Sequence, residues 1–403
     1  MADYRPARLR PRLRRRARRL YLAAMHSVDP TTESMIRSVL AYAENRLRLD
    51  PVPLDHGSQD AAELEAALRG LLGPEPHHPD QVLGVYASVM APAVISADSP
   101  RFLGFIPAAP TKAALLFDML ISCASIQGIS WLEAAGAIHA ENQVLRLIAD
   151  QAGMPASAGG CFVSGGSAGN LSALVVAREV AKRKAGSAAI GRRWRVEVSE
   201  DAHSSIVNAL RICEMDPRVR ARYDGVEHAD SFILDPHKWL FAPFDCAALL
   251  YRDPSIAKSV HKQDASYLDV IHDNPGEWNP ADYAYHLTRR ARGLPLWFSL
   301  AVYGVNAYAE AIETAIGLAL QTAAEIKGRD NLELIREPEL GVVLFRRRGW
   351  APARYTWWAD RLLQDQVAFI PPSAWEGETV ARFAFLHPHT PMDLVREILD
   401  RMD

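Results

Sequence analysis

The feature that most constrains this chain is a short apolar run that ends in Asp-Pro and leads into a lysine between two aromatic rings. It spans residues 231–239, SFILDPHKW. Phe232 to Leu234 are apolar and bounded by polar residues and proline, a pattern typical of a strand buried on both faces. Pro236 ends that strand. Lys238 is therefore predicted on a turn at the carboxyl end of a strand, where α/β sheets bind their ligands.

The neighbours of Lys238 favour a chemical role for its amine. We expect His237 and Trp239 to enclose the side chain and keep it poorly hydrated, which disfavours the ammonium form. A neutral amine is the nucleophile that forms a Schiff base with an aldehyde. The alternative is a surface lysine beside a partly buried tryptophan, and other motifs of the chain decide between the two.

A glycine-rich loop lies upstream, at residues 164–170, SGGSAGN. It follows a predicted strand and opens a predicted helix. Glycines allow close approach of the backbone to an anion, and the free N–H groups and dipole of a helix N-terminus favour a phosphate. By itself the loop could equally be a tight turn.

Three segments together resemble one known family. Residues 229–251, ADSFILDPHKWLFAPFDCAALLY, resemble the cofactor-lysine segment of the group II pyridoxal-phosphate amino-acid decarboxylases. The glycine loop resembles the phosphate-binding loop of this family. Residues 199–205, SEDAHSS, are similar to its S-x-x-A-H-S-S segment.

The resemblance implies roles for individual residues. Lys238 would attach pyridoxal phosphate as a Schiff base, and Gly166 and Ser167 would hold its phosphate, with Asp235 and His237 close by. The resemblance also implies that His203 stacks on the cofactor ring and donates a proton. It implies that Tyr267, on a mobile loop, reprotonates the substrate carbon.

The substrate pocket is less defined by the sequence. Residues 105–107 and Trp131 fall where the family builds a side wall, although plain core packing explains them equally well. Arg289, Arg290 and Arg292 form a basic run before a helix, to which we assign no substrate contact.

The resemblance also implies the architecture. We expect the α/β fold of type I pyridoxal-phosphate enzymes, like aspartate aminotransferase, with a central mostly parallel sheet in a large domain and a small α+β C-terminal domain. The predicted parts are a basic, disordered extension (1–24), an N-terminal helical dimerisation segment (25–100), a truncated large domain (101–308) and the small domain (309–403). A homodimer follows from the family.

One interval departs from the family. His203 and Lys238 are 35 positions apart (238 − 203), whereas family members have an interval several times longer that holds further strands. One of those strands carries, in a D-A-A-Y-like segment, the aspartate that pairs with the pyridine nitrogen of the cofactor. No such segment occurs here, and Asp216, Asp224 and Asp230 match no motif. We therefore expect an internal deletion, which exposes a sheet edge and weakens catalysis.

Composition excludes some other classes. No apolar run approaches the roughly 18 residues that cross a bilayer. Four cysteines without C-x-x-C spacing predict reduced core thiols of a cytoplasmic protein and no metal site. Nine of the first 19 residues are arginine, but no aromatic residues are interleaved among them in a nucleic-acid-binding pattern, so we expect a solvated arm that precedes a natural start at Met25.

These observations predict a pyridoxal-phosphate-dependent decarboxylase that converts an L-amino acid to its amine and CO2. The alternative is an inactive relative that keeps dimerisation or cofactor binding. A different reaction on the same fold is disfavoured, because the lysine and histidine segments both resemble those of decarboxylases.

Overall fold

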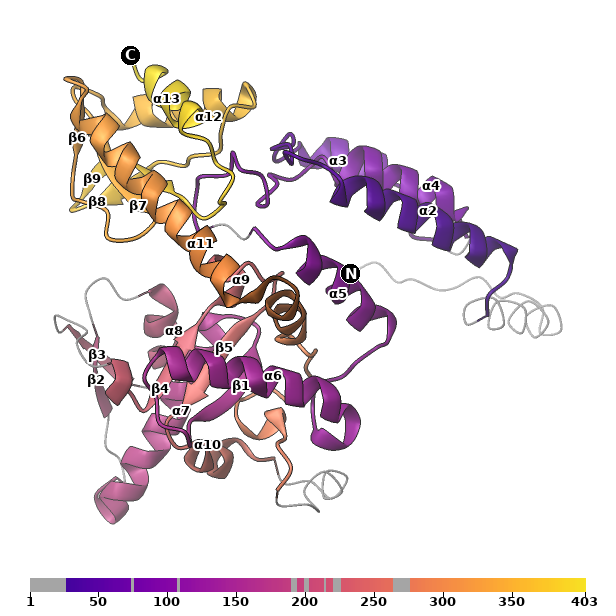
Figure 1. The fold of residues 1–403 in the computed structure, drawn as a ribbon, viewed down its shortest axis with the longest axis vertical. Coiled ribbons are helices and arrows are strands. Elements are labelled where there is room, and N and C mark those ends of the chain that lie inside the picture. The colour runs from indigo at the N-terminus through magenta and orange to yellow at the C-terminus, as the bar shows by residue number, and fades with distance from the viewer. Residues whose placement is uncertain are drawn as a thin grey trace, which may run out of the picture. The chain divides into compact units, whose positions relative to one another are not determined.

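Two compact units make up the chain. One comprises residues 1–96 with 363–366, and the other comprises residues 97–362 with 367–403 (Figure 1). The structure is a computed structural model, and it describes residues 27–73, 76–106, 109–189, 194–198, 203–213, 215–219, 226–263 and 276–403.

The first unit is helical. It contains α2 (Pro30–Leu47), α3 (Ala61–Leu68), α4 (Pro79–Val85) and the π-helical turn η1 (Tyr86–Met90). Asp29 caps α2, because its Oδ1 accepts a hydrogen bond of 2.8 Å from the backbone N–H of Thr32. None of the residues of α2, α3 and α4 is fully buried, so these helices expose apolar as well as polar side chains.

The second unit is built on a three-stranded sheet in the order β1 (Gly159–Val163), β5 (Ala247–Tyr251), β4 (Ser231–Leu234). Both β1 and β4 pair with β5 in antiparallel fashion. Two strands that are antiparallel to a common neighbour run parallel to each other. The chain therefore leaves β1 and β4 at the same edge of the sheet.

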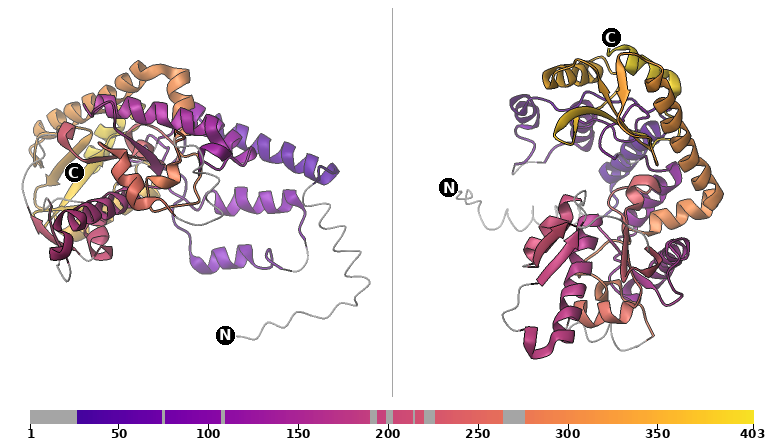
Figure 2. Two further views of the ribbon diagram at one scale, coloured as in Figure 1. Left: turned by 90° about the horizontal axis from the view of Figure 1, so that it is seen from below. Right: turned by 90° about the vertical axis from the view of Figure 1, so that its left-hand side faces the viewer.

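Helices cover both faces of this sheet (Figures 1 and 2). On one face, Phe162 and Leu250 pack with apolar residues of α6 (Trp131–Gln151) and α11 (Leu294–Lys327). On the other, Cys161 and Leu249 pack with residues of α7 (Gly166–Ala185) and α10 (Pro254–His261). The side chains of β1 and β5 thus alternate between two hydrophobic clusters, as the period of a strand requires. Helix α5 (Lys112–Cys123) contacts α11.

A separate pair of strands follows α7. β2 (Trp194–Val198) leads through α8 (Ser204–Ile212) to β3 (Met215–Val219), which pairs parallel to β2. β3 contains Pro217, which cannot donate a backbone hydrogen bond to a neighbouring strand. Proline is tolerated in strands at a sheet edge, and in the described part of the chain β3 pairs with β2 alone.

The α/β class is confirmed, but the expected mostly parallel central sheet differs from the observed pairing. Among the described strands of the second unit outside its C-terminal sheet, only β2 and β3 form a parallel pair, because β1 and β4 are each hydrogen-bonded to β5 in antiparallel fashion. Eleven residues, 220–230, separate β3 from β4, and a parallel crossover needs a dozen or more. This interval is therefore too short to add parallel neighbours between the two sheets.

Strand β4 also differs from the prediction of a fully buried strand. Each of its four residues is half-buried, whereas all five residues of β5 are buried. β5 has a partner on each side, but in the described chain β4 pairs with β5 alone. No other described strand pairs with its second edge to complete its burial.

The C-terminal part of the second unit is a four-stranded antiparallel sheet in the order β6 (Leu332–Leu334), β7 (Val342–Arg347), β9 (Glu378–Ala384), β8 (Ser373–Trp375). Its helices are α12 (Pro352–Gln364) and α13 (Met392–Asp400), with the end of α11 packed against them. Phe345, Phe383 and Trp358 lie in their shared core. The α+β character expected for the C-terminal part is confirmed here.

Cysteine burial agrees with the prediction at three of four positions. Cys161, Cys213 and Cys246 are buried, and burial raises the pKa of Cys161 to about 12. Cys123 is exposed, because it lies at the end of α5. All four are free thiols.

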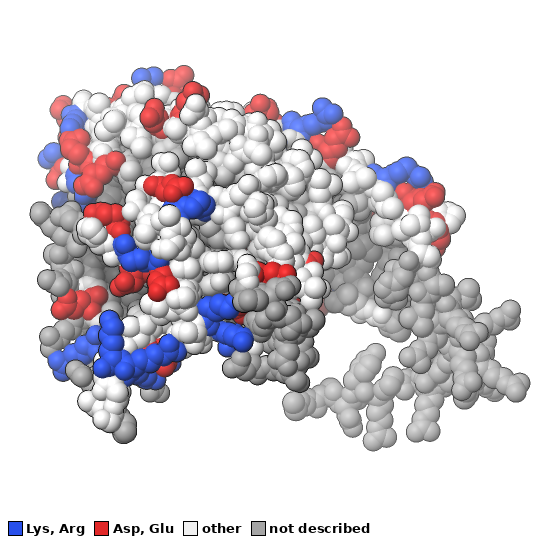
Figure 3. Space-filling view, turned by 60° about the horizontal axis from the view of Figure 1, so that its bottom comes forward, with Lys and Arg blue, Asp and Glu red and all other residues white. Residues whose placement is uncertain are grey.

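The described surface has two further general features. No helix within the described ranges combines the length and apolar character needed to span a bilayer. Acidic and basic side chains are interspersed on the face shown in Figure 3.

A buried ion pair joins α6 to the segment before α11. Arg289 Nη2 lies 2.8 Å from each carboxylate oxygen of Glu141, with the side chains 0% and 2% exposed. Glu141 also accepts a 2.7 Å hydrogen bond from the backbone N–H of Gly293, and Arg289 donates to the carbonyl of Gly128. The pair therefore fixes three chain segments at one point.

Breaking this pair should destabilise the fold strongly. Glu141→Gln leaves a buried guanidinium without its counter-charge, and we expect it to lower the free energy of unfolding by about 3–5 kcal/mol. Asp118→Asn, which breaks the more exposed pair with Arg290 (2.7 Å), should lower it by less than about 1 kcal/mol. Urea denaturation of both variants makes the comparison, and equal small losses would contradict the assigned role of Glu141.

Candidate active site

The pairing of the three-stranded sheet brings two predicted motifs together. Val163 at the end of β1 pairs with Ala247, and Leu234 at the end of β4 pairs with Ala248. The two strands therefore end almost level, with one strand between them, a separation of roughly 9–10 Å at the usual strand spacing. The glycine loop and the lysine turn both begin at this edge.

Lys238 lies on α9 (Pro236–Trp239), the single helical turn that follows β4. Its backbone N–H donates a 3.0 Å hydrogen bond to the carbonyl of Asp235. Its Nζ lies 2.8 Å from Asp235 Oδ2, with the lysine side chain 38% exposed and the aspartate side chain 15% exposed. The predicted position of the lysine at the carboxyl end of a strand is thus observed.

His237 and Trp239 do not enclose the amine of Lys238, contrary to the prediction. His237 is buried, its Nδ1 lies 2.6 Å from the carbonyl of Cys246, and its ring lies 5.0 Å from that of Phe244. Trp239 packs against two hydrophobic clusters. Adjacent residues of a helical turn point in different directions, so the rings flank Lys238 in sequence but face the protein interior.

Asp235 connects the lysine turn to the glycine loop. A Cβ atom placed on Gly166 would lie 3.0 Å from Asp235 Oδ2 and 3.2 Å from Oδ1, so the carboxylate packs against the first residue of α7. Only a residue without a side chain fits there comfortably. Asp235 Oδ1 is buried and has no hydrogen-bond partner among the described residues.

The glycine loop can receive an anion. Helix α7 begins at Gly166, its N-cap residue Gly165 has no capping side chain, and Ser167 in the first turn is exposed. The first N–H groups of a helix have no partner within the helix, and its dipole favours negative charge at this end. The loop therefore has the properties of a phosphate site.

His203 is tied to the same helix by a short chain of hydrogen bonds. Its Nδ1 lies 2.9 Å from Ser205 Oγ, and that hydroxyl also accepts a 2.9 Å hydrogen bond from Asn170 Nδ2 in the first turns of α7. His203 is exposed and precedes α8 directly. Asn170 and Ser205 lie within the predicted glycine loop and S-x-x-A-H-S-S motifs, but no role was predicted for either.

Other predicted site residues are not placed beside the lysine. Tyr267 and Pro107 lie outside the described residues. Phe105 is 62% exposed, and its ring lies 5.6 Å from that of Phe369. Trp131 begins α6 and donates a 2.9 Å backbone hydrogen bond to Asn279. The pocket wall thus stays a prediction.

The basic run takes part in ion pairs instead of lining a site. Arg290 pairs with Asp118 at 2.7 Å and Arg292 with Asp245 at 3.1 Å, in addition to the buried pair of Arg289. These contacts account for all three arginines structurally.

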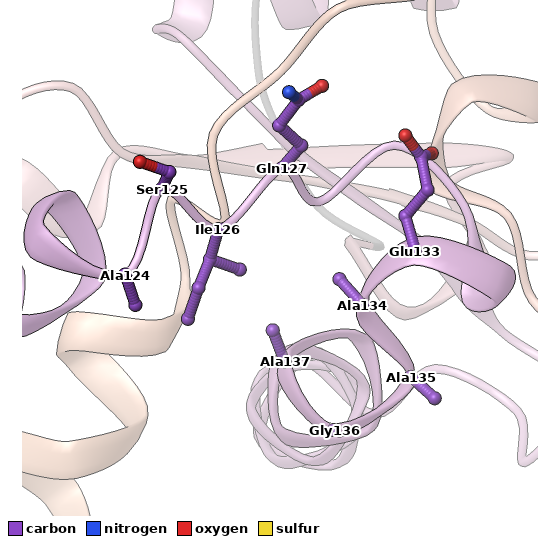
Figure 4. A pocket seen from close by; sticks show the side chains of 9 residues that line it. All are labelled: Ala124, Ser125, Ile126, Gln127, Glu133, Ala134, Ala135, Gly136 and Ala137. Carbon is purple, nitrogen blue, oxygen red and sulfur yellow. The ribbon is translucent and has the colours of Figure 1, made fainter. Parts of the chain in front are cut away.

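A separate cavity of about 510 Å³ lies where α5 ends and α6 begins (Figure 4). Small side chains of the first turns of α6 form one wall, and the end of α5 with the following loop forms the other. Its lining includes none of the predicted site residues. Chemical character, not cavity size, therefore identifies the candidate site.

The residues at the sheet edge fit a phosphorylated aldehyde. The N-terminus of α7 offers an anion site, and Lys238 offers an amine one strand away. Asp235 lies between them, and its buried Oδ1 has no hydrogen-bond partner among the described residues.

Comparison with known proteins agrees with this geometry. The pyridoxal-dependent decarboxylase conserved domain matches residues 69–219 and 212–348, in two pieces that overlap from the last residue of α8 through β3. Aromatic-L-amino-acid decarboxylase of Bacillus atrophaeus is 27% identical over 329 residues, covering 62% of this chain and 68% of that protein. The enzyme of the same name from Cavia porcellus is 26% identical over 372 residues, covering 68% and 76%.

The alignment with the Bacillus atrophaeus enzyme has more positions than the number of residues of this chain that it includes. Since 62% of 403 residues is about 250, roughly 79 of the 329 aligned positions (329 − 250) have no counterpart here.

Solved structures share the fold. Oryza sativa TDC, in a structure with PLP and tryptamine, has a TM-score of 0.81 at 21% identity and covers 93% of this chain and 99% of its own. Catharanthus roseus tryptophan decarboxylase, in complex with L-tryptophan, has a TM-score of 0.81 at 17% identity, covering 94% and 98%. The expected fold type is confirmed, and with the domain match over more than half of its length the chain belongs to the pyridoxal-dependent decarboxylase family.

Proposed function

We propose that this chain holds pyridoxal phosphate at Lys238 and is built to decarboxylate an L-amino acid to the corresponding amine and CO2. The observation that carries the proposal is the common sheet edge, where Asp235 contacts both Gly166 of the loop and the amine of Lys238. The names of the relatives, aromatic-L-amino-acid decarboxylases among them, support this reaction class.

Each residue at the edge has a distinct task in the proposal. The backbone N–H groups of Gly166 and Ser167 hold the phosphate at the start of α7, and Lys238 attaches the aldehyde carbon. His203 would stack on the ring, and its imidazole would donate a proton. His237 fixes the turn through its contacts with Cys246, because it is buried and bonded to the neighbouring strand.

When bound, pyridoxal phosphate supplies a sink for the electron pair that stays on the α-carbon when the carboxylate leaves as CO2. The chain would have to orient the substrate carboxylate for its departure and return one proton to the α-carbon. Tyr267 is the proposed donor of that proton. The amine is then released and Lys238 is free to begin another cycle.

A second candidate function is an inactive relative that only binds the cofactor or dimerises. It is favoured by the short interval between β3 and β4, by the half-buried β4, and by the aligned positions without a counterpart in this chain. We propose that an internal deletion removed the carboxylate that would keep the ring nitrogen protonated. Asp230, the described acid that directly precedes β4, is exposed.

The proposed assembly is a homodimer formed through the first unit. Four apolar residues of α2 are 40–53% exposed, namely Met35, Ile36, Val39 and Leu40. Exposed apolar residues clustered on a helix are typical of an interface. The four free cysteines support a reducing compartment such as the cytoplasm.

The attachment point can be tested directly. After incubation with pyridoxal phosphate and reduction by borohydride, mass spectrometry should locate the added group on Lys238. Lys238→Ala should abolish the adduct, because it removes the only amine proposed to react. Lys184→Ala, which changes an exposed lysine of α7, should leave it unchanged. An adduct that persists in Lys238→Ala would overturn the proposal.

A product assay separates the two candidate functions. Incubation of the cofactor-loaded chain with aromatic L-amino acids should yield amine and CO2 in equal amounts, slowly if the ring nitrogen has lost its carboxylate. Stoichiometric cofactor on Lys238 with no amine above that of Lys238→Ala would instead establish the inactive relative.

The dimer proposal predicts the effect of charge on α2. Ile36→Asp combined with Leu40→Asp places two carboxylates on one helix face, four residues apart. We expect light scattering to show a shift from twice the chain mass of 44.5 kDa to the single mass. Arg37→Asp, an exposed position on the same helix, is the control. A double variant that stays dimeric would place the interface elsewhere.

A further inference from the structure

The carboxylate of Asp235 lies where a cofactor phosphate would approach the loop. Both of its oxygens are within 3.2 Å of the Cβ position of Gly166, the first residue of α7. One oxygen lies 2.8 Å from Lys238 Nζ, while the other is buried without a hydrogen-bond donor among the described residues. One side chain thus occupies the start of the helix and pairs with the reactive amine.

An ionised carboxylate cannot assist a phosphate by hydrogen bonding. It only accepts hydrogen bonds, and so does a phosphate, so neither can donate to the other. A phosphate monoester carries roughly −1.5 to −2 charges at neutral pH. At a largely buried position, the repulsion between the two anions is screened much less than at the surface.

The ion pair has a second consequence at the amine. While Asp235 holds Lys238 as a paired ammonium, the amine has no free electron pair with which to attack an aldehyde. In the ligand-free chain, Asp235 therefore contacts both groups that the cofactor must engage.

We propose that Asp235 determines how tightly the site accepts a phosphorylated aldehyde, and that the incoming phosphate has to displace its carboxylate. This inference rests on the proposed function, in which Lys238 is the attachment point. Asp235 then acts through charge: it stabilises the ligand-free site and disfavours a phosphate dianion there. Asp235 would lie next to the phosphate, as the sequence predicts, but its negative charge would weaken the binding of the phosphate.

The test compares two aldehydes that differ only in the phosphate. Dissociation constants of pyridoxal phosphate and of pyridoxal are measured by equilibrium dialysis on the full-length, ligand-free chain. The variants are Asp235→Asn, which removes the charge and keeps the shape, and Asp230→Asn, which removes the same charge from an exposed position five residues away.

We expect Asp235→Asn to bind pyridoxal phosphate at least about tenfold more tightly than the wild type, because one full charge–charge repulsion is removed. Binding of pyridoxal should tighten by less than about threefold, since only the pairing with Lys238 changes. Asp230→Asn should leave both constants unchanged. Circular dichroism verifies folding, and Asp235→Ser replaces Asp235→Asn if the latter does not fold.

Three outcomes would overturn the inference. They are unchanged or weaker binding of pyridoxal phosphate in Asp235→Asn, an equal gain for both aldehydes, and an equal gain in Asp230→Asn. None of these affects the proposed function, which depends on the location of the borohydride-trapped adduct. An adduct on another lysine would overturn the function itself, whatever the dialysis shows.

Discussion

The pairing of β5 with β1 on one side and β4 on the other is the interaction on which the candidate site depends. Because both pairings are antiparallel, β1 and β4 run in the same direction, and their registers on β5 make them end within one residue of each other. The glycine loop leaves one strand and the lysine turn leaves the other. Asp235 then bridges the remaining gap, packed on Gly166 and paired with Lys238. A register shift of β4 by one residue would turn its side chains to the opposite face and separate these groups.

Much of this arrangement could be predicted from the sequence. The apolar run before Asp-Pro predicted β4 and placed Lys238 at its carboxyl end, and the glycine loop predicted the start of α7. Local patterns suffice for these features because they depend on neighbouring residues. The partner of Lys238 could not be predicted in the same way, because the contact of Asp235 with Gly166 arises only when two distant segments meet. The bridge from His203 through Ser205 to Asn170 has the same origin.

β4 has the sequence of an interior strand but lies at the edge of the described sheet. A strand with apolar side chains on both faces is typical of a sheet interior, and Phe232 and Ile233 pack into different clusters, as an interior strand would. Yet β4 is only half-buried, and β2 and β3 form a sheet of their own. The groups proposed to bind the cofactor thus lie on a sheet whose described strands end at β4. Binding and turnover can therefore differ in this chain.

Hydrogen–deuterium exchange with and without pyridoxal phosphate tests the central claim most directly. If the cofactor binds at the common edge of β1 and β4, protection should increase in peptides that cover residues 164–170 and 231–240. Peptides around the cavity at residues 124–137 should exchange as before. Protection confined to that cavity, or absent from the two predicted segments at saturating cofactor, would contradict the assignment of this sheet edge as the site.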